Sequence, residues 1–81
     1  MLNVPRKVRQ PAKHPALKKL GSRVRQLRQA RGVSQEALAD LTGIGRSYMS
    51  GIERGVRNCS VLHVLKLAKA LSVQPGDLLS N

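Results

Sequence analysis

Apolar residues recur every three or four positions along most of this chain, which is the spacing of a helix with one buried face. The first run extends to Gly32, and its apolar positions are Leu17, Leu20, Val24, Leu27 and Ala30. In a second run, Ser34 can cap a helix that continues through Thr42. In this helix Ala37, Leu38 and Leu41 point inward. Because no stretch alternates apolar and polar residues as a strand would, the pattern predicts an all-α fold.

The pattern continues with a short helix at residues 46–54, in which Met49 and Ile52 point inward. Gly43 suits the left-handed residue that ends the preceding helix, so only about three residues link the two helices. So short a link is typical of a helix-turn-helix. A fourth helix is expected after Ser60, and its apolar residues on one face are Val61, Val64, Leu67, Ala68 and Leu71. A short fifth helix begins with Pro75 and carries Leu78 and Leu79.

Residues 1–16 differ in composition from the rest of the chain. Three prolines, Pro5, Pro11 and Pro15, forbid a continuous helix there, and the same segment carries four Lys or Arg residues. We expect a mobile basic arm, which serves either as a solubilising tail or as a grip on DNA. Residues 17–81 then form a single domain.

Charge narrows the choice of partner. The 81 residues include 15 Lys or Arg against 4 Asp or Glu, giving a formal net charge of +11. That balance indicates a polyanion, with nucleic acid ahead of an anionic membrane surface. Because Tyr48 is the sole aromatic residue, the stacking platforms that bind single-stranded nucleic acid are missing.

The few candidate reactive residues argue against an enzyme. His14, His63 and Cys59 lack metal-like spacing, so neither a metal nor another cofactor is expected. The chain offers no plausible nucleophile with a general base, and no small-molecule ligand is evident. Cys59 is the single cysteine of the sequence, so an internal disulfide is excluded. It is either a buried small residue or a redox-sensitive thiol. No apolar run is long enough for a signal peptide or membrane span, which predicts a cytoplasmic protein.

Three strings carry a family resemblance: SRVRQLRQARGVSQEALADLTGI, RSYMSGIERGVRN and LKLAKALSVQPGDLL. Over residues 20–79 they resemble the lambda-repressor/Cro-like (XRE) helix-turn-helix family, and the second string is especially similar to the controller proteins of restriction–modification systems. The resemblance implies a compact five-helix domain whose helix 46–54 enters the major groove of double-stranded DNA. It also implies a bacterial or phage-encoded regulator, associated with the nucleoid.

The resemblance and the helical geometry together suggest the residues that contact DNA. Base contacts are expected from Arg46 and Ser47, in the first turn of the recognition helix, and from Arg57 in the following loop. Backbone contacts are expected from Gln35, Tyr48, Ser50, Arg54 and Asn58. Four of these residues have a plainer alternative: a nonspecific phosphate contact for Arg46 and Arg57, packing for Tyr48, and simple exposure for Gln35.

Gly51 falls on the outward side of the same helix, where glycine lowers helix stability by roughly 0.5–1 kcal/mol relative to alanine. We interpret it as a position that lets the helix lie close to DNA; the alternative is that glycine is merely tolerated. The resemblance further suggests that Arg28 and Glu53 form a structural ion pair between the first and third helices.

The last part of the chain has more apolar surface than one small core needs. We expect Leu62, Leu65, Leu78 and Leu79 to form a two-fold dimer interface, unless the terminal turn simply folds over them. The overall hypothesis is a dimeric transcriptional regulator that binds a palindromic or pseudo-palindromic operator and can touch RNA polymerase. The alternatives are an antitoxin or bridging module that binds another protein, and a cationic peptide at a membrane surface.

Overall fold

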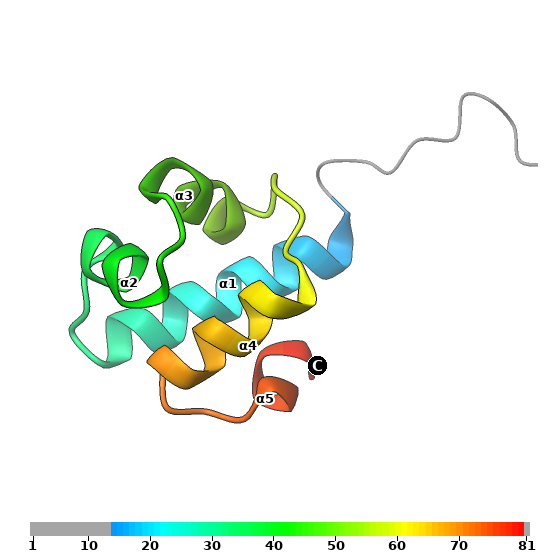
Figure 1. The fold of residues 1–81 in the computed structure, drawn as a ribbon. Helices are drawn as coiled ribbons and strands as arrows, with labels where there is room; N and C mark the ends of the chain where they lie inside the picture. The colour runs from blue at the N-terminus through cyan, green and yellow to red at the C-terminus, as the bar shows by residue number, and fades with distance from the viewer. Residues whose placement is uncertain (1–13, 81) are drawn as a thin grey trace, which may run out of the picture.

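The computed structural model describes residues 14–80, and within that range the chain forms five α-helices and no strand (Figure 1). They are α1 (Pro15–Ala30), α2 (Gln35–Thr42), α3 (Arg46–Arg54), α4 (Val61–Ala70) and α5 (Pro75–Leu79). The predicted all-α fold of five helices is confirmed. Most of the predicted arm, residues 1–13, lies outside the described residues.

Helix α1 begins at Pro15, two residues before Leu17, where the apolar pattern predicts its start. Proline fits the first position of a helix because it lacks the N–H group that would otherwise need a partner there. His14 caps this end, and its Nδ1 accepts a hydrogen bond from the backbone N–H of Ala16 at 3.0 Å. The last two residues of the segment expected to be an arm, Pro15 and Ala16, therefore belong to α1.

The turn between α2 and α3 is held by local hydrogen bonds. At the start of α2, the Ser34 hydroxyl accepts from the N–H of Ala37 at 3.0 Å, as predicted for the cap. At its end, the Thr42 hydroxyl donates to the Leu38 carbonyl at 2.8 Å and accepts from the N–H of Ile44 at 3.3 Å. Gly43 adopts the left-handed conformation, with φ of 72°, that redirects the chain into α3.

All five helices contribute to one core, which consists of Leu20, Val24, Leu38, Ala39, Ile44, Met49, Ile52, Val64, Leu67, Ala68, Leu71 and Leu78. Three residues expected in it, Ala30, Leu41 and Val61, are exposed. The buried face of α2 consists of Leu38, Ala39 and Thr42 and is centred near Thr42, and Leu41 points roughly 100° away from that centre. Val61 opens α4 one turn before Val64, where burial of that helix begins.

Helix α3 lies across α1 with backbone against backbone (Figure 1). A Cβ atom added to Gly21 of α1 would lie 2.3 Å from the carbonyl oxygen of Ile52 and 2.6 Å from that of Glu53. Only glycine permits this crossing, since both neighbours are backbone atoms that cannot move aside. The crossing, together with the packing of α2 on α3, fixes the position of α3 in the domain.

Candidate nucleic-acid interface

Helix α3 has one buried side and one solvent-facing side, as the sequence predicts. Met49 and Ile52 are completely or almost completely buried, whereas Arg46, Ser47 and Arg54 are exposed. No side chain caps its first residue, because Gly45 occupies that position. The first turn of α3 therefore presents Arg46 and Ser47 to solvent.

Arg46 has only a loose contact within the domain. Its Nη1 lies 3.9 Å from Oε1 of Glu36, and the two side chains are 69% and 66% exposed. An exposed pair at this separation contributes at most about 1 kcal/mol and is screened by salt. The guanidinium of Arg46 can therefore leave Glu36 for a stronger acceptor at little cost in free energy.

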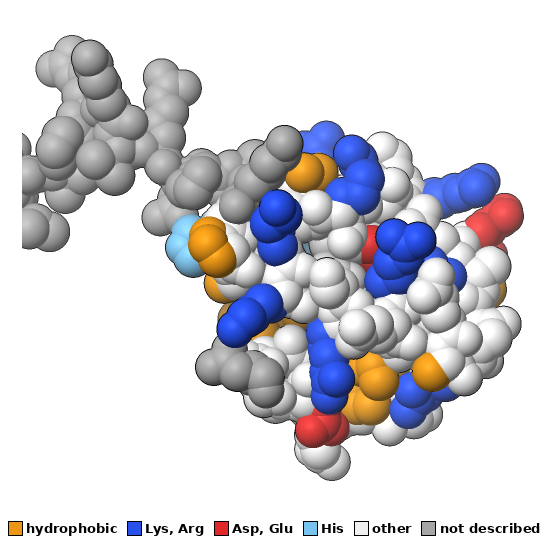
Figure 2. All heavy atoms as spheres, turned by 180° about the vertical axis from the view of Figure 1, so that it is seen from behind, with side chains coloured by type: hydrophobic (Ala, Val, Ile, Leu, Met, Phe, Trp, Pro, Cys, Tyr) orange, Lys and Arg blue, Asp and Glu red, His pale blue; other side chains and the backbone are white. Residues whose placement is uncertain are grey.

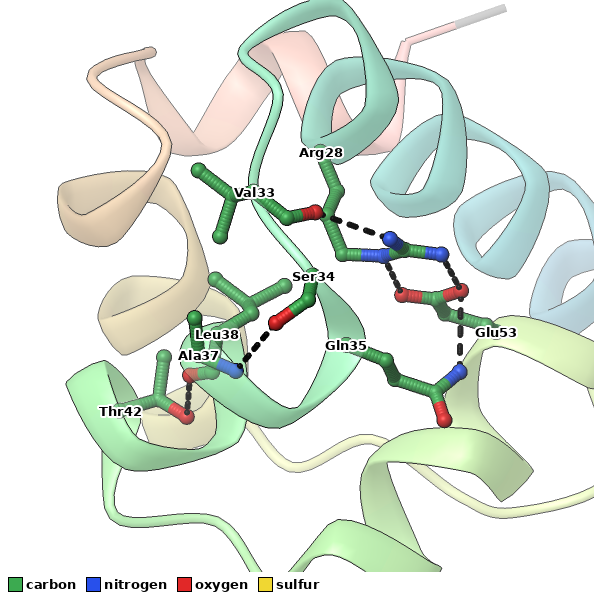
Figure 3. Close-up of polar contacts among 8 residues, drawn as sticks. All are labelled: Arg28, Val33, Ser34, Gln35, Ala37, Leu38, Thr42 and Glu53. Carbon is green, nitrogen blue, oxygen red and sulfur yellow. Dashed lines mark hydrogen bonds and ion pairs between the residues drawn. The ribbon is translucent and has the colours of Figure 1, made fainter.

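Glu53 is the acceptor of a buried polar cluster (Figure 3). Arg28 approaches it with two parallel bonds, from Nε to Oε2 at 2.6 Å and from Nη2 to Oε1 at 3.0 Å. The side chains are 13% exposed for Arg28 and 4% exposed for Glu53. The hydrogen bond to Glu53 raises the pKa of the Arg28 guanidinium above its ordinary value. The predicted ion pair is confirmed, and Arg28 belongs to the interior of the domain.

Gln35 joins the same cluster, a contact that the sequence analysis did not predict. Its Nε2 donates to Oε1 of Glu53 at 3.2 Å, so the first residue of α2 is tied to α3 (Figure 3). The amide retains a second N–H group and an oxygen that this bond does not use. Gln35 is partly buried and bonded to Glu53, so it is not the simply exposed glutamine of the plainer alternative.

Tyr48 packs against the domain. Its hydroxyl donates a hydrogen bond to the carbonyl oxygen of Asn58, and its ring meets that of His63 edge-on, with centroids 5.2 Å apart. Since the hydroxyl hydrogen is already used, Tyr48 cannot donate to a phosphate in this conformation. The geometry favours the packing alternative, in which Tyr48 holds the loop that follows α3.

Gly51 is buried, so the prediction that it lies open on the outward side of α3 is wrong. The side chain of Arg57 covers it: a Cβ atom at Gly51 would lie 2.2 Å from Cγ of Arg57. The guanidinium carbon of Arg57 lies 5.8 Å from the centroid of the Tyr48 ring. Arg57, itself exposed, is thus laid across the side of α3 that faces solvent.

Three of the four leucines expected at a dimer interface are exposed: Leu62, Leu65 and Leu79. Leu78 is the exception, at 2% exposed, because it fills the core where α5 packs against α1 and α4. It is therefore removed from the predicted interface. The remaining three lie on α4 and α5, which are side by side in the fold (Figure 1).

Exposed basic side chains come from several helices, including α1, α3 and α4. Figure 2 shows several Lys and Arg side chains, with few acidic ones, on the face behind the view of Figure 1. Glu53 is neutralised by Arg28, and the Asp77 carboxylate accepts from the N–H of Gln74 at the start of α5. Little negative charge thus opposes a polyanion. None of the helices in residues 14–80 is long and apolar enough to cross a membrane.

Cys59 lies half-buried in the loop between α3 and α4 and packs against the core. Burial raises the pKa of its thiol to about 11, since the charged thiolate is disfavoured away from water. At neutral pH the group is a thiol with little nucleophilic character. This environment matches a small buried residue better than a redox-sensitive one.

Comparisons with known proteins agree with this geometry. A family model described as a helix-turn-helix domain matches residues 19–81. Control protein C.BamHI of Bacillus amyloliquefaciens is 50% identical over 60 residues, which are 73% of this chain and 74% of that protein. Control protein C.SmaI of Serratia marcescens is 38% identical over 62 residues, 76% of this chain and 74% of that protein.

A solved structure extends the likeness to three dimensions. The crystal structure of the restriction-modification controller protein C.AhdI from Aeromonas hydrophila matches with a TM-score of 0.78 and 52% identity, over 80% of this chain and 98% of that one. Sequence and fold thus agree across the helices that position α3. The chain belongs to the helix-turn-helix family of DNA-binding transcriptional regulators.

Proposed function

We propose that this protein is the control protein of a restriction–modification system, and that it binds a palindromic or pseudo-palindromic operator as a dimer. The observation that carries the DNA-binding part is the exposed first turn of α3, fixed on a rigid helix crossing with Arg46 only loosely engaged. The names of the relatives C.BamHI, C.SmaI and C.AhdI support the biological setting.

In this proposal Arg46 and Ser47 read bases in the major groove. A guanidinium can give two parallel hydrogen bonds to O6 and N7 of guanine, which discriminates against other bases by about 1–3 kcal/mol. The Ser47 hydroxyl bonds either a base or a phosphate. Because Arg46 gives up only an exposed 3.9 Å contact to Glu36, most of the new interaction contributes to binding.

Contacts to the DNA backbone position the domain and determine most of its affinity. The proposed residues are Gln35, Ser50, Arg54 and Asn58, with Tyr48 acting through the loop that its hydroxyl holds. Gln35 begins α2, where backbone N–H groups and the helix dipole favour a phosphate. Its side chain is already oriented by Glu53, which reduces the entropy lost on binding.

Selection of bound sites from random duplex DNA tests base readout. We expect the wild-type protein to select a defined motif, and Arg46→Ala to lose one base preference within it. Arg25→Ala is the matched control, because it removes the same charge from an exposed position on α1. Uniform weakening across all sequences in Arg46→Ala would reduce Arg46 to a phosphate contact, and selection of no motif by the wild type would overturn the proposal.

The dimer is proposed to form through Leu62, Leu65 and Leu79. A two-fold dimer would place the two copies of α3 about 34 Å apart, one turn of DNA. Sedimentation should show a dimer for the wild type and a monomer for Leu62→Asp, whereas Leu41→Asp, also at an exposed leucine, should stay dimeric. A monomeric wild type at high micromolar concentration would contradict the dimer and turn attention to another protein as the partner of these leucines.

The regulatory outcome depends on where the operator lies. A dimer over the promoter blocks it, and a dimer beside the promoter can activate by contact with RNA polymerase. Transcription in vitro from a promoter that carries the selected motif, with and without the protein, distinguishes the two. No change in transcript at saturating protein would contradict a role in transcription.

A further inference from the structure

Arg57 lies in the loop after α3, and its side chain packs back against Gly51 of that helix. The Cγ atom of Arg57 would lie 2.2 Å, and its Cβ atom 3.2 Å, from a Cβ atom built on Gly51. The first distance is too short for a real contact and the second is tight, so the methylenes of Arg57 occupy the space that a side chain at residue 51 would need. The side chain of Arg57 thus covers Gly51 on the outward side of α3.

The loop after α3 is built so that Arg57 returns to this place. Gly55 adopts the left-handed conformation, with φ of 74°, and its N–H donates to the carbonyl of Ile52 at 3.0 Å. The N–H of Val56 donates to the carbonyl of Gly51 at 3.0 Å. These two bonds form a Schellman motif, which reverses the chain direction directly after the helix.

Gly51 and Tyr48 together form the site on α3 where the Arg57 side chain rests, which we call the seat. Gly51 contacts its methylenes, and Tyr48 lies beneath its guanidinium. Its hydroxyl bonds the carbonyl of Asn58, the residue after Arg57, and the Arg57 guanidinium lies over its ring at 5.8 Å. On a helix, residues 47 and 48 are the neighbours of residue 51 one turn earlier. The Arg57 side chain therefore runs along α3 from Gly51 toward the turn that holds Ser47, the proposed base-reading turn.

We propose that Gly51 is a positioning residue for specificity: by lacking a side chain, it seats Arg57 along α3, so that Arg57 reads the operator beside Arg46. The inference rests on the proposed function. It replaces close approach of the α3 backbone to DNA as the reason for glycine at this position. A side chain at Gly51 would push Arg57 off the helix, and the base preference due to Arg57 would be lost without any loss of fold.

A double-mutant cycle tests the proposal. Affinities of Gly51→Ala, Arg57→Ala and the double variant are measured for the selected motif and for motifs with single base changes. We expect Gly51→Ala and Arg57→Ala to lose discrimination at the same operator position, by about fivefold or more. In the Arg57→Ala background, Gly51→Ala should cause no further loss. Gly76→Ala is the matched control, since a Cβ atom there meets nothing within 4 Å.

Two results would overturn the proposal. Unchanged discrimination in Gly51→Ala would show that the seat does not matter for readout. An equal loss from Gly51→Ala with and without Arg57 would show that glycine acts by its own approach to DNA.

A nuclear Overhauser contact between the Gly51 Hα protons and the Arg57 methylenes tests the seat in the free protein. We expect it in the wild type and in Gly76→Ala, and its absence from the wild type would overturn the seat independently of DNA. If the wild type selects no motif, the proposed function fails, while this contact still decides whether Gly51 seats Arg57.

Discussion

Replacing Glu53 by glutamine tests whether the polar cluster beneath α3 holds the domain together. Glu53→Gln keeps the size and shape of the side chain but removes its charge. Arg28 would then keep its charge at a position only 13% exposed, with its Nη1 still bonded to the Val33 carbonyl at 2.9 Å. A buried charge without its partner is strongly destabilising, because neither water nor a carboxylate compensates it.

The structure sets the size of the effect. Breaking a buried ion pair by removing one partner costs about 3–5 kcal/mol. The amide oxygen of the variant can still accept one bond from Arg28, so we expect the lower end, about 3 kcal/mol. The 67 residues from 14 to 80 correspond to a total stability of about 3–10 kcal/mol. Glu53→Gln should therefore remove a large share of it and lower the melting temperature by roughly 12–24 °C.

Urea and thermal unfolding, followed by circular dichroism, measure the loss. Glu36→Gln is the matched control, because it makes the same chemical change in an exposed pair with Arg46 at 3.9 Å. We expect it to alter stability by less than about 1 kcal/mol. If the two variants lose equal stability, or if Glu53→Gln loses less than about 1 kcal/mol, the account of a buried, charge-compensating cluster is wrong.

Three further predictions concern packing and ionisation. Gly21→Ala should lower stability by about 2 kcal/mol or more in thermal unfolding, because its Cβ would meet the Ile52 carbonyl at 2.3 Å. Leu78→Ala should lower the free energy of unfolding by about 2–5 kcal/mol in urea titrations, since this side chain fills the core. Alkylation of Cys59 at pH 8 should be about a hundredfold slower in the folded than in the unfolded protein, because a thiol pKa of about 11 in place of 9.0 leaves about a hundredth of the thiolate.

Each of these has a control within the chain. Gly76→Ala, where a Cβ meets nothing within 4 Å, should leave stability almost unchanged, and a loss equal to that of Gly21→Ala would contradict the crossing argument. Leu41→Ala changes an exposed leucine, and an equal loss there would show that Leu78 is not part of the core. For Cys59, equal alkylation rates with and without urea would refute the effect of burial on its pKa.

Local signals explain why α3 was predicted correctly from its first residue to its last. Gly43 and Gly55 end α2 and α3 in left-handed conformations, and the spacing of Met49 and Ile52 defines the buried side. Each of these signals acts over a few neighbouring residues, so it can be read along the chain. The DNA-facing turn that starts at Arg46 follows directly from them.

The misplaced residues depend on contacts that helical periodicity does not describe. Gly51 is buried by Arg57, which lies in the loop beyond the end of its own helix. Leu78 belongs to a five-residue helix, which is too short to define a face until α1 and α4 are in place. The pairing of Arg28 with Glu53, separated by 25 positions, came from the family resemblance and not from spacing.

The crossing of α1 and α3 at Gly21 also bears on the heat of DNA binding. With the two backbones in contact, α3 already has its final position before an operator arrives, so no free energy is lost in ordering it. Association should therefore show the negative heat-capacity change expected from the surface buried at the interface, without the larger change that accompanies folding on binding. Substitutions among the outward side chains of α3 can then change which operator is bound, while the free energy of holding α3 in place stays the same.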